Sequence, residues 1–369
     1  MNLYRGYEKR KEAIDKRISS IIERSQFVFG EELDTLEKEL ATYTGAKYAV
    51  GVSSGHVGLV LALLALGFNA GEDHSNKEVI VPAMTFFSTA EAPSFLGMKV
   101  RVCDIDEYFN MDVKKLESLI NKNTAAIIPV NLFGQCANFD VILDIARKNN
   151  IFVIEDACQS FGASYKNVKS CSGKLGDIAV TSFFPAKPLG CFGDGGLVFT
   201  DNEEFYKNLK QLRHHGDEGG MNHVKLGTTG RLDNMQAGIL LEKFKGFEED
   251  MTYRRNAAKY YNEQLKGIVK VPEIAEYTQS VHAQYVIQVE NNRDEVRAKL
   301  AELGVPTALY YPHPIHLAPI LVKKLGYKEG DMPVSEYASK HNIALPIDND
   351  ILKEEQDIVI DAIKKVVGK

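Results

Sequence analysis

The segment Thr181–Phe199, TSFFPAKPLGCFGDGGLVF, holds a single lysine, Lys187, ahead of a glycine-rich loop. We interpret the segment as a strand, a turn that carries Lys187, and a loop that leads into a second strand. Pro185 and Pro188 keep the lysine out of a helix or a sheet ladder, because proline fixes φ and lacks the backbone N–H. The glycines leave room for a large, flat group beside the amine. This arrangement suits Schiff-base chemistry with an aldehyde cofactor, whereas a solvated lysine on a surface hairpin is the alternative.

Alternating strands and helices precede this segment. The pattern predicts apolar strands at Tyr48–Val52, Glu78–Val81, Lys99–Cys103, Ala125–Val130 and Ile151–Glu155. Helices are predicted at Ala13–Arg24, Glu31–Tyr43, His56–Leu66, Thr85–Leu96, Asp112–Ile120 and Phe139–Lys148. Because parallel strands need crossover helices and are buried on both faces, this alternation predicts an α/β fold with a mostly parallel sheet flanked by helices.

The chain after the lysine loop has a different pattern. It predicts a helix, a polar loop and a long helical stretch at Glu203–Arg213, His214–Thr229 and Leu232–Leu265. A strand and two helices follow at Ala283–Val289, Arg293–Leu303 and Leu352–Val367. This mixture indicates a smaller α+β domain. We therefore expect a large domain at residues 1–245 and a small C-terminal domain at residues 246–369.

The composition narrows the function classes. With 369 residues, 44% of them hydrophobic, the chain can build a sizeable core and two domains. The net charge of −6, without a long basic run, argues against nucleic acid as the main partner. The longest apolar run, Val57–Phe68, is too short to cross a bilayer, and the charged N-terminus lacks the apolar region of a signal peptide. Five scattered cysteines indicate reduced thiols, so we expect a cytoplasmic protein.

Polar and aromatic residues follow several predicted strands. Ser54-Gly55, Thr85-Phe86, Asp156 and Gln159 each come just after a strand, and parallel sheets bind ligands beyond the carboxyl ends of their strands. The Ser54-Gly55 turn opens a helix whose free N–H groups offer a seat for phosphate. A plain strand–helix turn is the alternative for that segment.

Asp156 and Phe86 each have a functional and a structural interpretation. Asp156 ends an apolar strand one αβ unit before Lys187, so both residues can reach one crevice. Its carboxylate could pair with a protonated pyridine nitrogen and keep the ring an electron sink, or it could cap a helix. Phe86 could stack on an aromatic ring, although such a phenylalanine is more often part of the core.

Several motifs resemble those of one family. They are VPAMTFFSTAEA, IIPVNLFGQ, IEDACQSFGASY, TSFFPAKPLGCFGDGG, GRLDNMQAGIL, YYPHPIHL and NIALPI. From about Phe29 to Pro346, the chain resembles the DegT/StrS nucleotide-sugar aminotransferases, which are pyridoxal-phosphate enzymes of the aspartate-aminotransferase fold type (fold type I). The lysine loop is most similar to the branch that acts on UDP-linked 3-keto-N-acetylhexosaminuronates in surface-polysaccharide pathways.

The resemblance implies a set of cofactor contacts. Lys187 would form the imine with pyridoxal phosphate and carry the proton of transamination, while Asp156 would hold the pyridinium. The further expected contacts are Gln159 near the ring hydroxyl, Phe86 over the ring face, Ser182 and Ser54-Gly55-His56 at the phosphate, and Thr229 from the second subunit. The surroundings of Lys187 should depress its pKa from the free value of about 10.4.

The resemblance also implies the partners. We expect a homodimer whose active sites are shared, each completed by the second subunit's loop before Gly230-Arg231. Arg231 suits a pyrophosphate or a carboxylate, because its guanidinium binds either group bidentately. Arg213, His316 and Tyr311 are further expected substrate contacts, although a solvated surface role is the alternative for the first two. The amino group would pass from an amino acid, usually glutamate in this family, to a nucleotide-linked keto-sugar.

Three positions depart from the family pattern. His56 replaces a threonine that contacts phosphate, Thr229 replaces an asparagine that reaches across the dimer, and Asn131 replaces a histidine. The retained Lys187 and Asp156 favour transamination. The alternatives are an aminotransferase for another nucleotide keto-sugar at C3 or C4, another pyridoxal-phosphate reaction, or a non-catalytic regulatory homologue.

The histidines do not have the spacing of a metal site. His313 and His316 are separated by a proline, which argues against a helical pair of ligands. His214, His215 and His223 form only a loose group. We therefore expect no metal.

Overall fold

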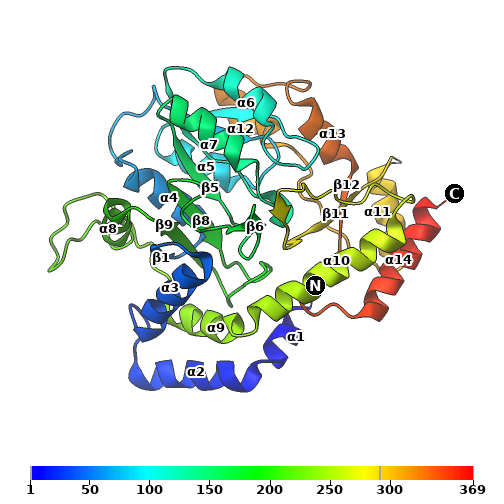
Figure 1. Cartoon of the computed structure of the whole chain (residues 1–369), viewed down its shortest axis with the longest axis horizontal. Helices are drawn as coiled ribbons and strands as arrows, with labels where there is room; N and C mark the ends of the chain where they lie inside the picture. The colour runs from blue at the N-terminus through cyan, green and yellow to red at the C-terminus, as the bar shows by residue number, and fades with distance from the viewer. Residues whose placement is uncertain (1, 291, 369) are drawn as a thin grey trace.

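The centre of the fold is a mostly parallel sheet. A computed structural model describes residues 2–290 and 292–368 (Figure 1). The strands of this sheet are β1 (Tyr48–Val52), β2 (Glu78–Pro82), β3 (Lys99–Cys103), β4 (Thr124–Ile127), β5 (Phe152–Asp156), β8 (Ile178–Ser182) and β9 (Gly196–Thr200). Their order is β1-β9-β8-β5-β4-β2-β3, with parallel pairing from β8 to β3 and antiparallel pairing of β9 with both its neighbours. The predicted α/β fold is confirmed.

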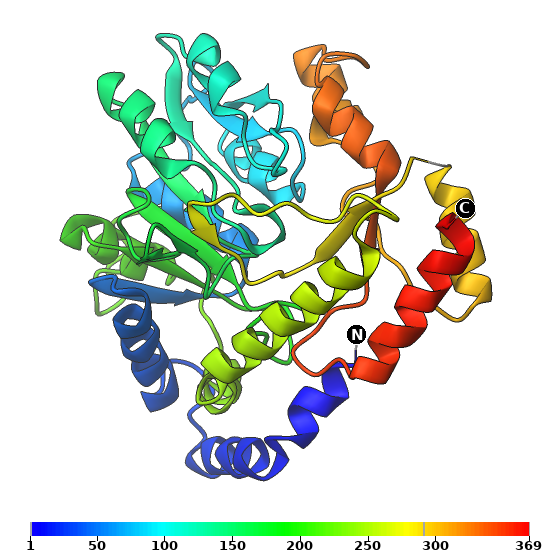
Figure 2. The same ribbon diagram turned by 45° about the vertical axis from the view of Figure 1, so that its right-hand side comes forward.

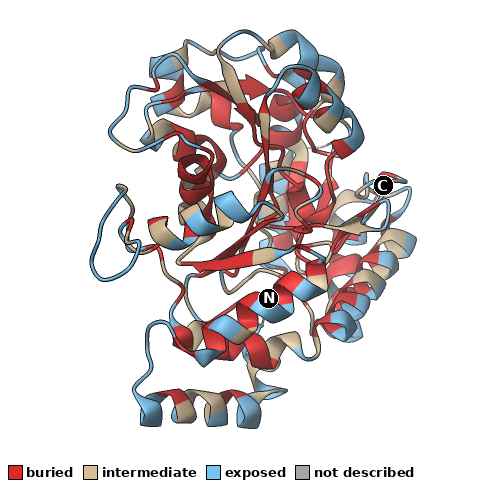
Figure 3. Ribbon diagram, turned by 60° about the vertical axis from the view of Figure 1, so that its left-hand side comes forward, coloured by how far each residue is buried: buried red, intermediate tan, exposed pale blue. Residues whose placement is uncertain are grey.

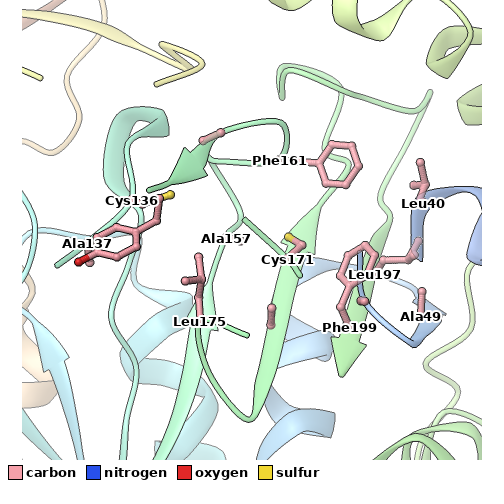
Figure 4. Close-up of a cluster of buried hydrophobic side chains, with 14 of the residues drawn as sticks. Leu40, Ala49, Cys136, Ala137, Ala157, Phe161, Cys171, Leu175, Leu197 and Phe199 are labelled. Atoms are coloured by element: carbon pink, nitrogen blue, oxygen red, sulfur yellow. The ribbon is translucent and has the colours of Figure 1, made fainter. Parts of the chain in front are cut away.

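Helices bury both faces of the sheet, because alternate side chains of each strand point to opposite sides. In β2, Val79 and Val81 join one apolar cluster and Ile80 joins the other. The Ile80 side is covered by α3 (Glu31–Thr44), α6 (Val113–Leu119), α7 (Phe139–Lys148) and α9 (Asn234–Phe244). The other side is covered by α4 (Gly55–Ala65), α5 (Ser88–Phe95) and α8 (Glu203–Leu212). Figure 4 shows part of the Ile80-side cluster, where Leu40 of α3 lies near Leu197 and Phe199 of β9.

The C-terminal part builds a separate core. It consists of α10 (Phe247–Leu265), β11 (Tyr285–Gln288), α11 (Arg293–Glu302), β12 (Asn342–Leu345) and α14 (Lys353–Val367). The strands β11 and β12 pair antiparallel. The expected continuous helical stretch is instead two helices, because the chain breaks at Lys245-Gly246 and glycine is a poor helix residue. The boundary at residues 245 and 246 stays a prediction, because Phe247 and Met251 of α10 still pack in the cluster on the Ile80 side of the large sheet.

Two segments tie the C-terminal part to the large domain, the first through a separate three-stranded sheet. In the first, β10 (Thr278–Gln279) pairs with β6 (Ser164–Tyr165), which also pairs with β7 (Val168–Lys169). In the second, η2 (Ile315–Leu317) and α12 (Pro319–Leu325) place Ile315 and Leu321 in the large-domain core ahead of α13 (Pro333–His341). The remaining short element is η1 (Leu132–Gly134). These crossings fix where the two parts meet.

The N-terminal helices α1 (Leu3–Glu8) and α2 (Lys11–Arg24) wrap the outside of the molecule (Figures 1 and 2). Arg17 of α2 binds Glu242 of α9 at 2.8 Å. Arg5 of α1 binds Glu355 of α14 through two hydrogen bonds of 2.6 and 2.8 Å. The beginning and the end of the chain are therefore joined by charge-assisted hydrogen bonds.

The polar stretch 214–229 has no helix or strand, as predicted, and projects from the body beside α8 (Figures 1 and 3). Its tip is largely exposed, whereas the strands of the sheet are buried (Figure 3). The predicted helix at Thr85–Leu96 begins later, at Ser88, and Thr85 stays in the preceding turn, where its Oγ1 bonds to Thr89 Oγ1 at 2.8 Å. None of the described helices has the length and apolarity needed to cross a bilayer.

Gly58 lets α4 approach the sheet closely. A Cβ added at Gly58 would lie 2.6 Å from Val180 Cγ1, which is shorter than van der Waals contact. We expect Gly58→Ala to lower the free energy of unfolding by about 1–3 kcal/mol through overpacking, measured by urea denaturation. In a Val180→Ala background, Gly58→Ala should lower the free energy of unfolding by less than it does in the wild-type background, because the smaller side chain leaves room for the added methyl group. An unchanged denaturation midpoint for Gly58→Ala would contradict this account of the packing.

Candidate active site

A cavity of about 690 Å³ lies between the carboxyl ends of the parallel strands and the C-terminal part. Its large-domain wall includes Ser54, Gly55, His56, Phe86, Thr89, Asp156, Cys158, Gln159, Ser182 and Lys187. Its opposite wall includes Gln284, Thr307, Tyr310 and Tyr311. The fold therefore brings together most of the residues that the sequence singles out.

Lys187 lies at the start of the loop between β8 and β9. Its backbone N–H donates to the carbonyl of Phe184 at 2.8 Å, which closes the turn. Gly190 folds back so closely that an added Cβ would lie 2.4 Å from the Pro185 carbonyl oxygen, so only glycine fits there. Burial lowers the pKa of the Lys187 amine from its usual value, while the charge of Asp156 acts in the opposite direction.

Asp156 ends β5 and is held on both carboxylate oxygens. Thr89 Oγ1 donates to Oδ2 at 2.8 Å, and the Cys158 N–H donates to Oδ1 at 3.2 Å. Thr89 is in turn bonded to Thr85. The carboxylate is thereby fixed in orientation while it faces the cavity.

The N-terminus of α4 forms a third part of the site. Ser54 caps the helix by accepting from the Val57 N–H at 3.1 Å, and the Gly55 and His56 N–H groups donate to no acceptor within the described residues. A Cβ at Gly55 would lie 2.7 Å from Cys158 Sγ and 3.0 Å from Ser182 Cβ, which requires glycine. His56 Nδ1 lies 3.4 Å from Glu91 Oε2. Free N–H groups, the Ser182 hydroxyl and the helix dipole together make a seat for an anion.

Two aromatic rings and an amide complete the cavity wall. Phe86 is 60% exposed despite being apolar, and its ring centroid lies 6.2 Å from that of Tyr311. The Gln159 amide donates from Nε2 to the Tyr311 hydroxyl at 3.1 Å and accepts from the Phe133 N–H at 2.8 Å. Tyr311 thus connects the C-terminal part to a residue that we expect beside the cofactor ring.

Four expected contacts do not line the cavity of a single chain. Thr229 bonds to His215 at 2.9 Å, and Arg231 bonds to His214 at 3.0 Å, both at the base of the projecting loop. Arg213 is buried, where it pairs with Glu37 and donates to the Gly51 carbonyl. His316 is fully buried and bonds to Glu336 at 3.0 Å. Arg213 and His316 are therefore not at the solvated surface either, and their contacts are those of structural residues.

Asn131 points away from the cavity. Its Nδ2 donates to Glu155 Oε1 at 2.8 Å and to Ser160 Oγ at 3.0 Å, in a buried network behind β5. Burial raises the pKa of Glu155 to about 7. Because Glu155 and Asp156 are adjacent on a strand, their side chains point to opposite faces. The departure at Asn131 thus affects the support of β5 and not the cavity surface.

Sequence reasoning missed several residues of the site. Thr89, Cys158, Gln284 and Thr307 all line the cavity, and Thr89 bonds directly to Asp156. The helical spacing of Thr85 and Thr89, one turn apart, is the signal that could have indicated Thr89. Among the described residues, no group of three His, Cys, Asp or Glu side chains is placed to hold a metal ion.

The residues present fit pyridoxal phosphate. Lys187 would take its aldehyde, Asp156 its ring nitrogen, Phe86 its ring face, and the N-terminus of α4 with Ser182 its phosphate. One cavity contains an amine of lowered pKa, an oriented carboxylate and unpaired N–H donors. This donor set matches an aldehyde, a basic ring nitrogen and an anionic phosphate.

A sequence model described as the DegT/DnrJ/EryC1/StrS aminotransferase family matches residues 8–364. The UDP-2-acetamido-2-deoxy-3-oxo-D-glucuronate aminotransferase of Pseudomonas aeruginosa is 41% identical, over 91% of this chain and 91% of its own. The crystal structure of DesV from S. venezuelae matches with a TM-score of 0.95 at 32% identity, covering 100% of this chain and 98% of that one. NtdA from Bacillus subtilis, solved with bound cofactor PMP, matches with a TM-score of 0.89 at 31% identity, covering 98% and 82%.

The effect of the Asp156 charge on the pKa of Lys187 should be measurable. Asp156→Asn removes a negative charge that raises the pKa of Lys187, so that pKa should fall further. In cofactor-free protein, the pH midpoint for reaction of Lys187 with pyridoxal phosphate, followed by absorbance, should then move to lower pH. The affinity for pyridoxal phosphate should drop by about tenfold or more, since the ring nitrogen loses its partner. Glu91→Gln, whose carboxylate faces His56, is the control, and an equal shift in both variants would contradict the assignment.

Proposed function

This chain belongs to the DegT/DnrJ/EryC1/StrS aminotransferase family and is a pyridoxal-phosphate-dependent aminotransferase, and we propose that its acceptor is a nucleotide-linked keto-sugar. The acceptor we propose is a UDP-linked 3-keto-N-acetylhexosaminuronate, with glutamate as the amino donor. The name of the Pseudomonas relative supports this acceptor. The product would be an amino sugar for a surface polysaccharide, made in the cytoplasm.

The observation that carries this proposal is the position of Lys187 and Asp156 in one cavity. Pyridoxal phosphate, when bound, supplies an electron sink that allows an amino group to leave one carbon and join another. Asp156 would hold the ring nitrogen of the bound cofactor in its protonated form and so keep that sink effective. The retention of both residues argues against a purely regulatory homologue.

Lys187 is the group best suited to move protons in the cavity. Burial lowers its pKa, which favours the free amine, so its Nζ can take a proton from the donor's α-carbon. Burial has the opposite effect on two neighbours, because it raises the pKa of the Cys158 thiol and of the Tyr311 hydroxyl. Both groups therefore stay protonated near neutral pH and are poor bases.

The anionic substrate needs cations that the single-chain cavity lacks. No arginine is among the described residues that line it, and Lys187 is its one lysine. We propose that Arg231 of a second subunit supplies the charge, in a homodimer with shared sites. Exposed apolar side chains support such an interface: Phe86 and Phe184 at the cavity, and Met221, 85% exposed, and Leu226, 67% exposed, on the projecting loop.

Borohydride reduction tests the role of Lys187. The purified enzyme, reduced and digested, should carry the cofactor on the peptide that contains Lys187, and Lys187→Ala should carry none. Wild-type enzyme should then convert glutamate and a UDP-linked 3-keto-sugar acid to the amino sugar, detected by mass spectrometry. Preference for a dTDP- or GDP-linked 4-keto-sugar would overturn the proposed acceptor and leave the aminotransferase assignment intact.

Mixing two inactive variants tests the shared sites. Lys187→Ala and Arg231→Ala should each lose activity as homodimers, because each lacks one component of every site. After unfolding and refolding together, random pairing should restore about a quarter of wild-type activity, since half of the dimers are mixed and have one intact site of two. Failure of the mixture to regain activity would contradict the shared site, provided that each variant alone refolds as a dimer.

A further inference from the structure

The loop that follows Lys187 is held by side chains from two separate parts of the molecule. Asn349 Nδ2 donates to the Pro188 carbonyl at 3.0 Å, and Lys243 Nζ donates to the Gly190 carbonyl. Gln236 Oε1 accepts from the Phe192 N–H at 2.8 Å. Gln236 and Lys243 lie two turns apart on α9, so they face the loop from the same side. Asn349 comes from the C-terminal part, between β12 and α14.

Arg254 fixes the orientation of the Asn349 amide. Arg254 Nε donates to Asn349 Oδ1 at 2.8 Å, and its Nη1 donates to the carbonyls of His282 and Ala283, both at 3.1 Å. Arg254 is only 2% exposed, so the guanidinium cannot exchange these partners for water. Because Arg254 occupies the amide oxygen, the amide nitrogen must face Pro188.

The segment around Asn349 is also held from the N-terminal side. Asp348 accepts from the Asn2 N–H at 3.1 Å, and Asp350 pairs with Lys9. Arg5 Nη1 donates to the Asp350 carbonyl at 3.4 Å. The hydroxyl of Tyr253 on α10 donates to the Ile351 carbonyl. Asn349 therefore projects from a braced segment that moves with the C-terminal part.

We propose that Asn349 is a positioning residue for Lys187. Through Asn349, the packing of the C-terminal part against the large domain determines where the Lys187 amine lies. This proposal rests on the proposed function, in which Lys187 moves the proton. The Pro188 carbonyl follows Lys187 by one residue, so a shift of the backbone at Pro188 can redirect the Lys187 side chain. Among the described residues that follow α10 in the sequence, only Asn349 has a side chain that hydrogen bonds to the loop at 184–195. Without the bond from Asn349, the loop keeps its α9 contacts, its internal backbone hydrogen bonds and the contact between Phe192 and Tyr7, but no side chain holds the Pro188 carbonyl.

Asn349→Asp is the sharpest test, because it only replaces the amide nitrogen that faces Pro188 with an oxygen. The variant keeps an oxygen for Arg254 but places a second oxygen against the Pro188 carbonyl, where the two repel. Stopped-flow absorbance of the holoenzyme mixed with glutamate measures the first half-reaction without any sugar. We expect its rate constant to fall about ten- to a hundredfold, because small misplacements of a reacting group are costly, with the apparent Kd for glutamate within about twofold. Asn349→Ala, which removes the donor without adding charge, should show the same split.

Gln236→Glu is the matched control. It makes the same amide-to-carboxylate change at the loop's other end, and it keeps the oxygen that accepts from Phe192. We expect less than about a threefold change in its rate constant, since the contact lies five residues from Lys187. Wild-type rates in both Asn349 variants, an equal loss in Gln236→Glu, or a loss confined to Kd would each overturn the proposal.

A second readout separates this inference from the proposed function. The rate at which pyridoxal phosphate attaches to Lys187 in cofactor-free protein depends on the placement of the amine and needs no donor. If wild-type enzyme does not react with glutamate, the proposed function fails. Slower attachment in Asn349→Ala than in Gln236→Glu, at unchanged thermal midpoints, would still support the role of Asn349, and equal rates would overturn it.

Discussion

The withdrawal of one amine from water is the constraint on which the rest of the site depends. Burial lowers the pKa of Lys187, and that effect is useful only if the amine stays accessible to a reacting carbon. Pro185, Pro188 and the close approach of Gly190 to Pro185 satisfy both requirements. They close the turn tightly and direct the Lys187 side chain into the cavity. The negative charge of Asp156, on the same wall of the cavity, opposes the effect of burial on the pKa of the Lys187 amine.

Both walls of the cavity are needed to define the site. The large domain supplies Lys187, Asp156 and the N-terminus of α4, all at carboxyl ends of strands or in the turns that follow them. The C-terminal part supplies Tyr311, which bonds to Gln159, and Asn349, which bonds to the lysine loop. The position of the C-terminal part therefore bears both on Gln159, which lines the cavity, and on the loop that carries Lys187.

The sequence was informative where local pattern and topology agree. The strand boundaries of β1 and β3 were predicted to the residue, and the convergence of Ser54, Phe86, Asp156 and Gln159 followed from the parallel sheet. Contacts between distant residues, such as Gln159 with Tyr311 or Asn349 with Pro188, leave no local signal. Side-chain direction was the other missing quantity: Arg213 and His316 satisfy buried carboxylates, and Asn131 faces away from the cavity.

The contacts between residues 2–9 and residues 348–355 have a consequence for how the enzyme matures. The bonds from Asn2, Arg5 and Lys9 reach residues 348–355, and Asn349 reaches the lysine loop. On the ribosome, the strands that carry Asp156 and Lys187 emerge long before those partners exist. A nascent chain can therefore assemble the large sheet early and still lack the brace for its reactive amine. Under the role proposed for Asn349, the Lys187 amine is placed only after residues 348–355 have left the ribosome and folded onto the N-terminal helices.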